Sequence, residues 1–94
     1  MYYVYVLKSY RDKLFYIGFT TNIKDRISCH NNGAVPATKC RRPLELIFYE
    51  AFMSKKDAKR RENYFKTTKG KVALKIMLKD YYLSQSIRPC SSVG

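Results

Sequence analysis

The chain has 94 residues, 46% of them hydrophobic and 28% charged, which suits one small globular domain and leaves no room for a second. Nineteen Lys and Arg residues against seven Asp and Glu give a net charge of +12, so a polyanion is the expected partner and nucleic acid fits best. Because the sequence has no long apolar run, lipid-anchor signal or secretory leader, we expect a cytoplasmic protein that makes no membrane contact.

The first predicted element is a β-hairpin. Residues Tyr2–Leu7 and Leu14–Phe19 each mix aromatic and β-branched side chains in an apolar run, and the polar stretch Lys8–Lys13 separates them. Gly18 lies inside the second strand. A glycine in that place marks either a bulge or a close approach by another backbone or a ligand.

A helix is predicted next, over Ile23–Asn31. The Thr21-Asn22 pair can cap its first turn, and Gly33 follows it as a stop signal. Arg26 and His30 lie one turn apart on this helix, beside its apolar stripe. We therefore expect both side chains at the rim of the sheet rather than pointing freely into water.

The third predicted strand, Leu44–Phe52, follows a turn-rich basic loop at Ala34–Pro43. In this strand Leu44, Leu46 and Phe48 alternate with their neighbours, which predicts one apolar face.

Two more helices complete the predicted order. Ser54 and Asp57 form a capping-box-like pair at the start of a helix that runs to about Thr67, and Gly70 breaks it. A third helix is predicted over Lys71–Leu83. The order ββαβαα predicts an α+β fold, a three-stranded antiparallel sheet flanked by helices. Residues 1–83 would form this domain, and the Ser-rich residues 84–94 a flexible tail.

Glu62 is an acid in the middle of a helix stripe that ought to be buried, four residues after Ala58 and three before Phe65. An ionised carboxylate there is costly unless it is paired or bound to a metal. The ordinary alternative is a helix ion pair with Lys66 or a contact to Arg61.

These motifs together resemble the GIY-YIG nuclease domain. Tyr3-Val4-Tyr5 and Tyr16-Ile17-Gly18 stand where that family has its two signature strands, and Arg26, His30 and Glu62 follow in the family's order. The resemblance covers roughly residues 2–83, and it is closest to the small stand-alone bacterial members, the UPF0213-like type. In this chain Tyr3 occupies the place of the family's first glycine.

The resemblance implies a role for each motif residue. Glu62 would bind a single Mg²⁺ or Mn²⁺, and Arg26 would hold the scissile phosphate. One of Tyr5 and Tyr16 would position or deprotonate the attacking water, and the other would contact substrate or a metal-bound water. His30 would relay a proton, protonate the leaving oxygen or hydrogen-bond a phosphate.

A tyrosine that acts as a base must lose its proton easily. Because free tyrosine titrates near pH ~10, we expect nearby positive charge to favour the phenolate. Each motif residue also has a structural alternative: the two tyrosines as packing residues, Arg26 as a solvated helix cation, and His30 as a buried hydrogen-bonding residue.

Basic side chains around this constellation are candidates for contacts to the nucleic-acid backbone. They are Lys39, Arg41, Arg42, Lys59, Arg61 and Lys66. The sequence thus predicts a metal-dependent endonuclease that hydrolyses DNA, structure-selective in repair or recombination. The alternatives are a noncatalytic module that binds DNA or RNA through its basic surface, and a catalytic module directed by a separate targeting protein.

Overall fold

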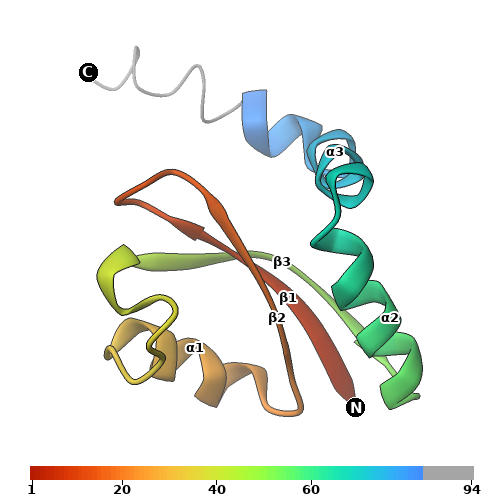
Figure 1. The fold of residues 1–94 in the computed structure, drawn as a ribbon, viewed down its shortest axis with the longest axis horizontal. Coiled ribbons are helices and arrows are strands. Elements are labelled where there is room, and N and C mark those ends of the chain that lie inside the picture. Colours follow the sequence, from red (N-terminus) through yellow and green to blue (C-terminus); the bar gives the residue numbers. More distant parts are fainter. Residues whose placement is uncertain (84–94) are drawn as a thin grey trace. The chain divides into compact units, whose positions relative to one another are not determined.

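Three strands form one antiparallel sheet in the computed structural model, which describes residues 1–83 (Figure 1). The strands are β1 (Tyr2–Ser9), β2 (Phe15–Thr20) and β3 (Leu44–Phe52), and their order in the sheet is β2-β1-β3. With the helices, this confirms the predicted α+β fold and the element order. The predicted tail, residues 84–94, lies outside the described residues.

The hairpin pairs β1 and β2 in a regular register. Tyr5 lies opposite Gly18, and Leu7 lies opposite Tyr16. Directly paired residues point to the same face of a sheet, and so do residues two apart on one strand. Tyr5 and Tyr16 therefore share a face, as the sequence predicts.

Strand β3 contains an irregularity that the alternating pattern does not reveal. Val6 pairs with Phe48, but Leu7 pairs with Leu46, so Ile47 is an extra residue in the ladder. The extra residue turns Leu46 toward the face of Tyr5, whereas Phe48 points to the opposite face. The prediction of one continuous apolar face on this strand is therefore wrong.

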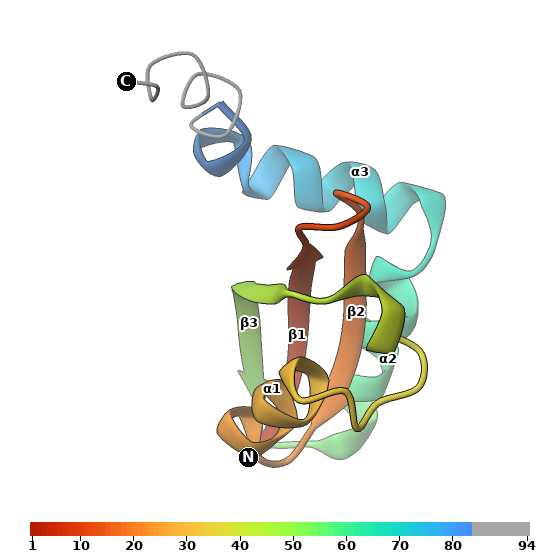
Figure 2. The same ribbon diagram turned by 90° about the vertical axis from the view of Figure 1, so that its left-hand side faces the viewer.

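Helix α1 (Ile23–Asn31) covers the face of the sheet that carries Tyr5, and Figure 2 shows it in front of the strands. The Asn22 side chain caps the helix by accepting a hydrogen bond from the backbone N–H of Asp25. Gly33 follows the helix with a φ of 85°, a left-handed conformation that glycine adopts without strain. Ile23 and Ile27 pack against the core, as predicted.

Helix α2 (Lys55–Phe65) begins after Ser54 and contributes its residues 55–63 to the same compact unit, residues 1–63. Arg61 donates to Glu50 of β3 at 2.8 Å, and the Lys59 ammonium lies 4.3 Å from the ring centroid of Phe19 on β2. Glu50 and Phe19 both pair with Val4, whose side chain points away from the face of Tyr5. These contacts place α1 and residues 55–63 of α2 on opposite faces of the sheet.

The second compact unit comprises residues 64–94 and contains α3 (Thr68–Met77). The Thr67 side chain caps α3 by accepting from the backbone N–H of Gly70. A Cβ on Gly70 would lie only 1.9 Å from the Tyr64 carbonyl oxygen, so the tight junction requires a glycine. The prediction that Gly70 breaks the helix is therefore wrong: the chain turns at Lys66 and Thr67, and Gly70 lies in the first turn of α3.

Within residues 1–83, none of the helices combines the length and the apolar character needed to cross a bilayer.

Candidate active site

Three predicted site residues form a hydrogen-bonded cluster beneath α1. The Nε of Arg26 donates to the Tyr5 hydroxyl at 3.3 Å, and that hydroxyl lies 2.8 Å from Nε2 of His30. The other ring nitrogen of His30, Nδ1, lies 2.7 Å from the hydroxyl of Thr38. Tyr5, His30 and Thr38 are all fully buried. Strand β1, helix α1 and the loop after it thus meet in one polar chain inside the core.

Gly18 makes room for Tyr5 in this cluster. A Cβ built on Gly18 would lie 2.3 Å from both Cζ and Oη of the tyrosine. The close approach inferred from the sequence is therefore made by the side chain of Tyr5 across the hairpin. The two strand motifs are linked physically, because the last residue of one packs on the last residue of the other.

We expect Gly18→Ala to lower the free energy of unfolding by roughly 1–3 kcal/mol, since an overpacked core must displace its neighbours. A shift of Tyr5 costs free energy, because its ring is buried and its hydroxyl is hydrogen-bonded to both His30 and Arg26. Urea unfolding of the single variants and of Gly18→Ala/Tyr5→Val measures the effect. A clash with the ring predicts that Gly18→Ala costs far less when Tyr5 is already valine; equal costs in both backgrounds would contradict it.

Tyr16 is the more accessible of the two motif tyrosines. It is only partly buried, and its ring centroid lies 5.0 Å from that of His30 and 6.4 Å from that of Tyr5. Its ring therefore packs on the buried cluster while part of the side chain faces the surroundings. Of the pair, Tyr16 is the side chain that a molecule outside the domain can reach.

Burial raises the pKa of Tyr5 above the usual value for tyrosine. The hydrogen bond and the positive charge of Arg26 act in the opposite direction, while Tyr16 and Glu62 add to the increase. Positive charge near Tyr5 is present, as expected from the sequence, but it does not outweigh the cost of a buried phenolate. Arg26 alone therefore does not favour the phenolate form of Tyr5.

The imidazole of His30 has a strongly lowered pKa. Burial and, secondarily, the charge of Arg26 lower its pKa to about 4. The sequence placed this residue at the rim of the sheet, but its exposed fraction is 0%, because the ring is enclosed by Tyr5, Tyr16 and Thr38. A fully enclosed imidazole cannot bind a phosphate directly. The hydrogen-bonding neighbours of the His30 ring are the hydroxyls of Tyr5 and Thr38.

Arg26 differs from two other arginines of this unit in its partners. Among the described residues, its only hydrogen bond is the one from Nε to Tyr5, and its side chain is half-buried at the edge of the cluster. Arg41 and Arg61 instead bind the carboxylates of Asp12 and Glu50 through both Nε and a terminal nitrogen. The two terminal nitrogens of Arg26 have no hydrogen-bond partner among the described residues.

Glu62 is buried on α2, as its place in the apolar stripe predicts, with 9% of the residue exposed. Lys59 forms an ion pair with it, with Nζ lying 3.6 Å from Oε1. Arg61, the alternative partner suggested by the sequence, binds Glu50. The Glu62 carboxylate and α1 lie on opposite faces of the sheet, but the carboxylate is near enough for its charge to raise the pKa of Tyr5.

The donor set around Glu62 suits a metal site with a single protein carboxylate. Within residues 1–83, no three His, Cys, Asp or Glu side chains converge on one point. A caged ion is therefore not supported there, whereas Mg²⁺ commonly keeps several waters and uses one or two carboxylates together with substrate phosphate. Glu62 fits that second kind of site.

The predicted nucleic-acid contacts divide into two groups. Arg41 and Arg61 are held in ion pairs, so their guanidinium groups serve the fold, and Asp12 beside Arg41 has its pKa lowered to about 2 by that contact. The remaining four, Lys39, Arg42, Lys59 and Lys66, are exposed. The ion pair of Arg41 could not be predicted from a local pattern, because its acid partner Asp12 is 29 residues away in sequence.

Thr38 is the residue of this cluster that sequence reasoning missed. It lies in the loop between α1 and β3, just before a short 3₁₀ helix, η1 (Lys39–Arg41). A threonine in a basic loop gives no local signal of burial. The one available clue was its distance of eight residues from the only histidine, and that clue is weak.

The fold and the cluster define the class of the protein as a small α+β domain in which strand tyrosines meet an arginine and a histidine of the next helix. The GIY-YIG catalytic domain family matches residues 1–75. The chain belongs to the GIY-YIG family, which confirms the resemblance seen in its motifs.

Its relatives include small bacterial proteins of the UPF0213 type. A UPF0213 protein of Staphylococcus haemolyticus is 43% identical over 76 residues, covering 80% of this chain and 92% of that protein. One of Clostridium perfringens is 43% identical over 67 residues, covering 70% and 71%. The solution NMR structure of a UPF0213 protein from Bacillus halodurans is similar with a TM-score of 0.50 and 36% identity, covering 79% of this chain and 82% of that one.

Proposed function

We propose that this chain is a divalent-metal-dependent endonuclease that hydrolyses DNA phosphodiester bonds. The observation that carries the proposal is the cluster of Arg26, Tyr5 and His30, which joins the motif residues of two strands and a helix by hydrogen bonds. Membership of the GIY-YIG family supports the same class of chemistry.

Arg26 is the residue we assign to the scissile phosphate. Its Nε bond to Tyr5 fixes the plane of the guanidinium, and its two terminal nitrogens remain for the nonbridging oxygens. Charge develops on these oxygens in the transition state, where a fixed pair of donors stabilises it more than in the ground state. Arg26 would therefore act mainly on the rate of the chemical step.

Tyr16 is the residue we assign to the attacking water. It is partly exposed, whereas Tyr5 is enclosed and has a raised pKa. In this division Tyr5 holds Arg26 in place and exchanges hydrogen bonds with His30, and Tyr16 contacts the water or the substrate. This assignment narrows the alternatives that the motifs leave open.

Glu62 is the residue we assign to the metal, Mg²⁺ or Mn²⁺. A bound divalent ion would supply Lewis-acid stabilisation to the phosphate and lower the pKa of a coordinated water. Glu62 and Lys59 come from α2, while Arg26 comes from α1 on the other face of the sheet. The edge strand β2 carries both Tyr16 and Phe19, and Phe19 contacts Lys59. We therefore propose that the DNA backbone passes along the β2 edge.

We further propose that recognition depends on the shape of the DNA and not on its base sequence. The basic residues are spread through the fold, and the described elements include no recognition helix of the kind that enters a major groove. Such binding suits a cytoplasmic enzyme that cuts branched or damaged DNA during repair or recombination, alone or beside a targeting protein.

The test is a cleavage assay with Mg²⁺ and with Mn²⁺ on branched, nicked, flapped and single-stranded DNA, and on matched RNA. Metal-dependent cutting of any DNA substrate supports the proposal, and the ranking of substrates gives the preference. No cleavage of any substrate by folded protein that binds DNA would reject the enzyme assignment.

The second candidate is a noncatalytic module that binds DNA or RNA. The burial of Tyr5 and His30 favours it, because a domain that kept the cluster only for packing would bury both residues. The two candidates differ in the assay above, since both bind nucleic acid but only one cuts it.

Nucleic-acid affinity should fall steeply with salt in either case. Released counterions give a log-log slope of about −0.9 for each phosphate contact on duplex DNA. Arg42→Gln should make this slope less steep by up to about one unit, because Arg42 is exposed. Arg41→Gln should leave the slope unchanged and lower thermal stability, since Arg41 binds Asp12. Equal slopes for wild type and Arg42→Gln in fluorescence anisotropy titrations would remove Arg42 from the binding surface.

A further inference from the structure

The polar chain beneath α1 is a series of hydrogen bonds in which each group must act as donor or acceptor. Its members are Arg26, Tyr5, His30 and Thr38, joined by contacts of 3.3, 2.8 and 2.7 Å. An arginine can only donate, whereas the two hydroxyls and the neutral imidazole can each donate or accept. The directions of the two bonds that His30 makes therefore depend on which of its nitrogens carries the proton.

We propose that Thr38 is a positioning residue that holds His30 in the tautomer with its proton on Nδ1, so that Nε2 accepts a hydrogen bond from the Tyr5 hydroxyl. In this arrangement Nδ1–H donates to the Thr38 hydroxyl. Tyr5 then uses its oxygen to accept from Arg26 and its hydrogen to donate to His30, which satisfies the phenol fully.

The other tautomer satisfies the chain less well. With the proton on Nε2, both His30 and Arg26 would donate to the Tyr5 oxygen, and the phenolic hydrogen would have no acceptor among the described residues. Tyr5 has an exposed fraction of 0%, so water does not replace that acceptor. The Nδ1–H form instead leaves the hydroxyl hydrogen of Thr38 without an acceptor among the described residues, and an alcohol is a weaker donor than a phenol.

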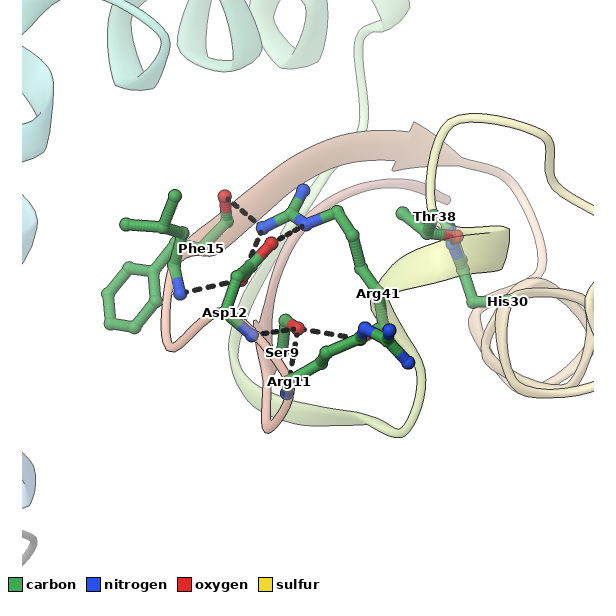
Figure 3. A network of polar contacts seen from close by, with 8 residues as sticks. Ser9, Arg11, Asp12, Phe15, His30, Thr38 and Arg41 are labelled. Carbon is green, nitrogen blue, oxygen red and sulfur yellow. Dashed lines mark hydrogen bonds and ion pairs between the residues drawn. The ribbon is translucent and has the colours of Figure 1, made fainter.

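Thr38 can hold the imidazole because its own backbone is fixed on both sides. Its N–H donates to the Val35 carbonyl at 3.1 Å, and its carbonyl accepts from the N–H of Arg41 at 2.9 Å. Arg41 is in turn anchored to the β1–β2 hairpin, by its ion pair with Asp12 at 2.6 Å and by the Ser9 hydroxyl, which donates to its carbonyl at 2.6 Å. Figure 3 shows the Arg41 side chain directed toward Asp12, whereas Thr38 lies beside His30, away from that ion pair.

The consequence concerns the orientation of Arg26. A Tyr5 hydroxyl that donates to His30 presents its lone pair to Nε of Arg26, and this holds the guanidinium plane. If the tautomer changes, the phenolic hydrogen must turn away from Nε2 and compete with that bond. The effect on cleavage rests on the proposed function, whereas the tautomer itself does not.

The experiment is nitrogen NMR of the imidazole at neutral pH, which needs no assignment because the chain has a single histidine. Protein labelled with ¹⁵N-histidine should show a protonated Nδ1 and an unprotonated Nε2. In Thr38→Val, an isosteric change that removes the hydroxyl, Nδ1–H loses its acceptor, so the fraction of the population with the proton on Nε2 should rise. Thr38→Ser should restore the wild-type pattern, and Thr21→Val, at an exposed threonine, should not change it.

A wild-type protein with its proton on Nε2 would overturn the proposal, and so would an unchanged ratio of the two tautomers in folded Thr38→Val. If that variant does not fold, the wild-type and Thr38→Ser spectra still decide the tautomer. In a cleavage-competent protein, Thr38→Val should lower kcat at least several-fold with little change in KM. Absence of cleavage in the wild type would reject the proposed function and leave the tautomer assignment intact.

Discussion

Glu62→Gln should abolish metal-dependent DNA cleavage almost completely while DNA binding is retained or tightens. The substitution keeps the shape and helix propensity of the side chain and removes the charge that would hold the ion. Loss of even an outer-shell partner costs metal sites roughly 10–100-fold, so loss of the proposed ligand should exceed about 100-fold. Binding should not suffer, because a carboxylate beside a phosphate repels it when the ion is absent.

Glu50→Gln is the matched control for this measurement. Like Glu62, Glu50 is an acid paired with a cation of α2. Its partner is Arg61, and no ligand role is assigned to it. If Glu62 only pairs with the half-exposed Lys59, Glu62→Gln should instead cost under about 1 kcal/mol of stability and leave cleavage unchanged. Metal-dependent cleavage at the wild-type rate by folded Glu62→Gln would remove Glu62 from the site.

Arg26→Lys should lower kcat by about 100-fold or more, close to the effect of Arg26→Ala, because losing one oriented transition-state donor costs roughly 10²–10³. A lysine keeps the charge but loses two things. It cannot donate from Nε to Tyr5 while presenting two further nitrogens, and it cannot offer the planar fork that matches a phosphate. Single-turnover cleavage at saturating protein separates this loss of rate from any loss of affinity.

Arg42→Lys is the control for Arg26→Lys, since Arg42 is exposed and its Nε binds only the carbonyl of Lys39 among the described residues. A point charge should replace it with little change in cleavage or stability. Unchanged single-turnover cleavage in Arg26→Lys would show that Arg26 contributes only charge, and the phosphate assignment would then fail.

Local signals in the sequence predicted those elements whose ends are marked by local chemistry. Helix α1 begins and ends as predicted, at Ile23 and Asn31, because Asn22 caps one end and Gly33 terminates the other. The start of α2 follows the same logic, with the Asp57 N–H lying 3.5 Å from the Ser54 hydroxyl. These contacts join residues within a few positions of each other, which a sequence pattern can detect.

Features set by distant partners could not be predicted in the same way. The extra residue at Ile47 depends on how β3 pairs with β1, about 40 residues earlier in the sequence. In the local sequence Gly70 looks like a helix breaker. A glycine is needed there because the Tyr64 carbonyl of the preceding helix lies too close to leave room for a Cβ. A glycine signals a special backbone position without telling whether the helix ends there or something packs there.

In the candidate site, too, features set by local spacing could be predicted and features set by distant partners could not. The spacing of Tyr5, Tyr16, Arg26 and His30 was enough to place them together, because strand pairing and one helical turn fix their separations. Their burial was not predictable, since a single histidine beside an apolar stripe looks the same at a rim and in a core. Arg26 and Arg41 also look alike in the sequence; only the acid that binds one of them separates the roles.

The extra residue in β3 also determines where this strand tolerates a change in length. Ile47 is the extra residue, so a chain without it would place Leu46 directly before Phe48, and Leu44 and Leu46 would keep the α1 side in a regular ladder. Deleting Glu45 instead would bring Leu44 next to Leu46 and turn the two leucines to opposite faces, because neighbouring strand residues alternate. Among homologues, we therefore expect a one-residue gap within residues 44–48 to fall at Ile47 and not at its neighbours.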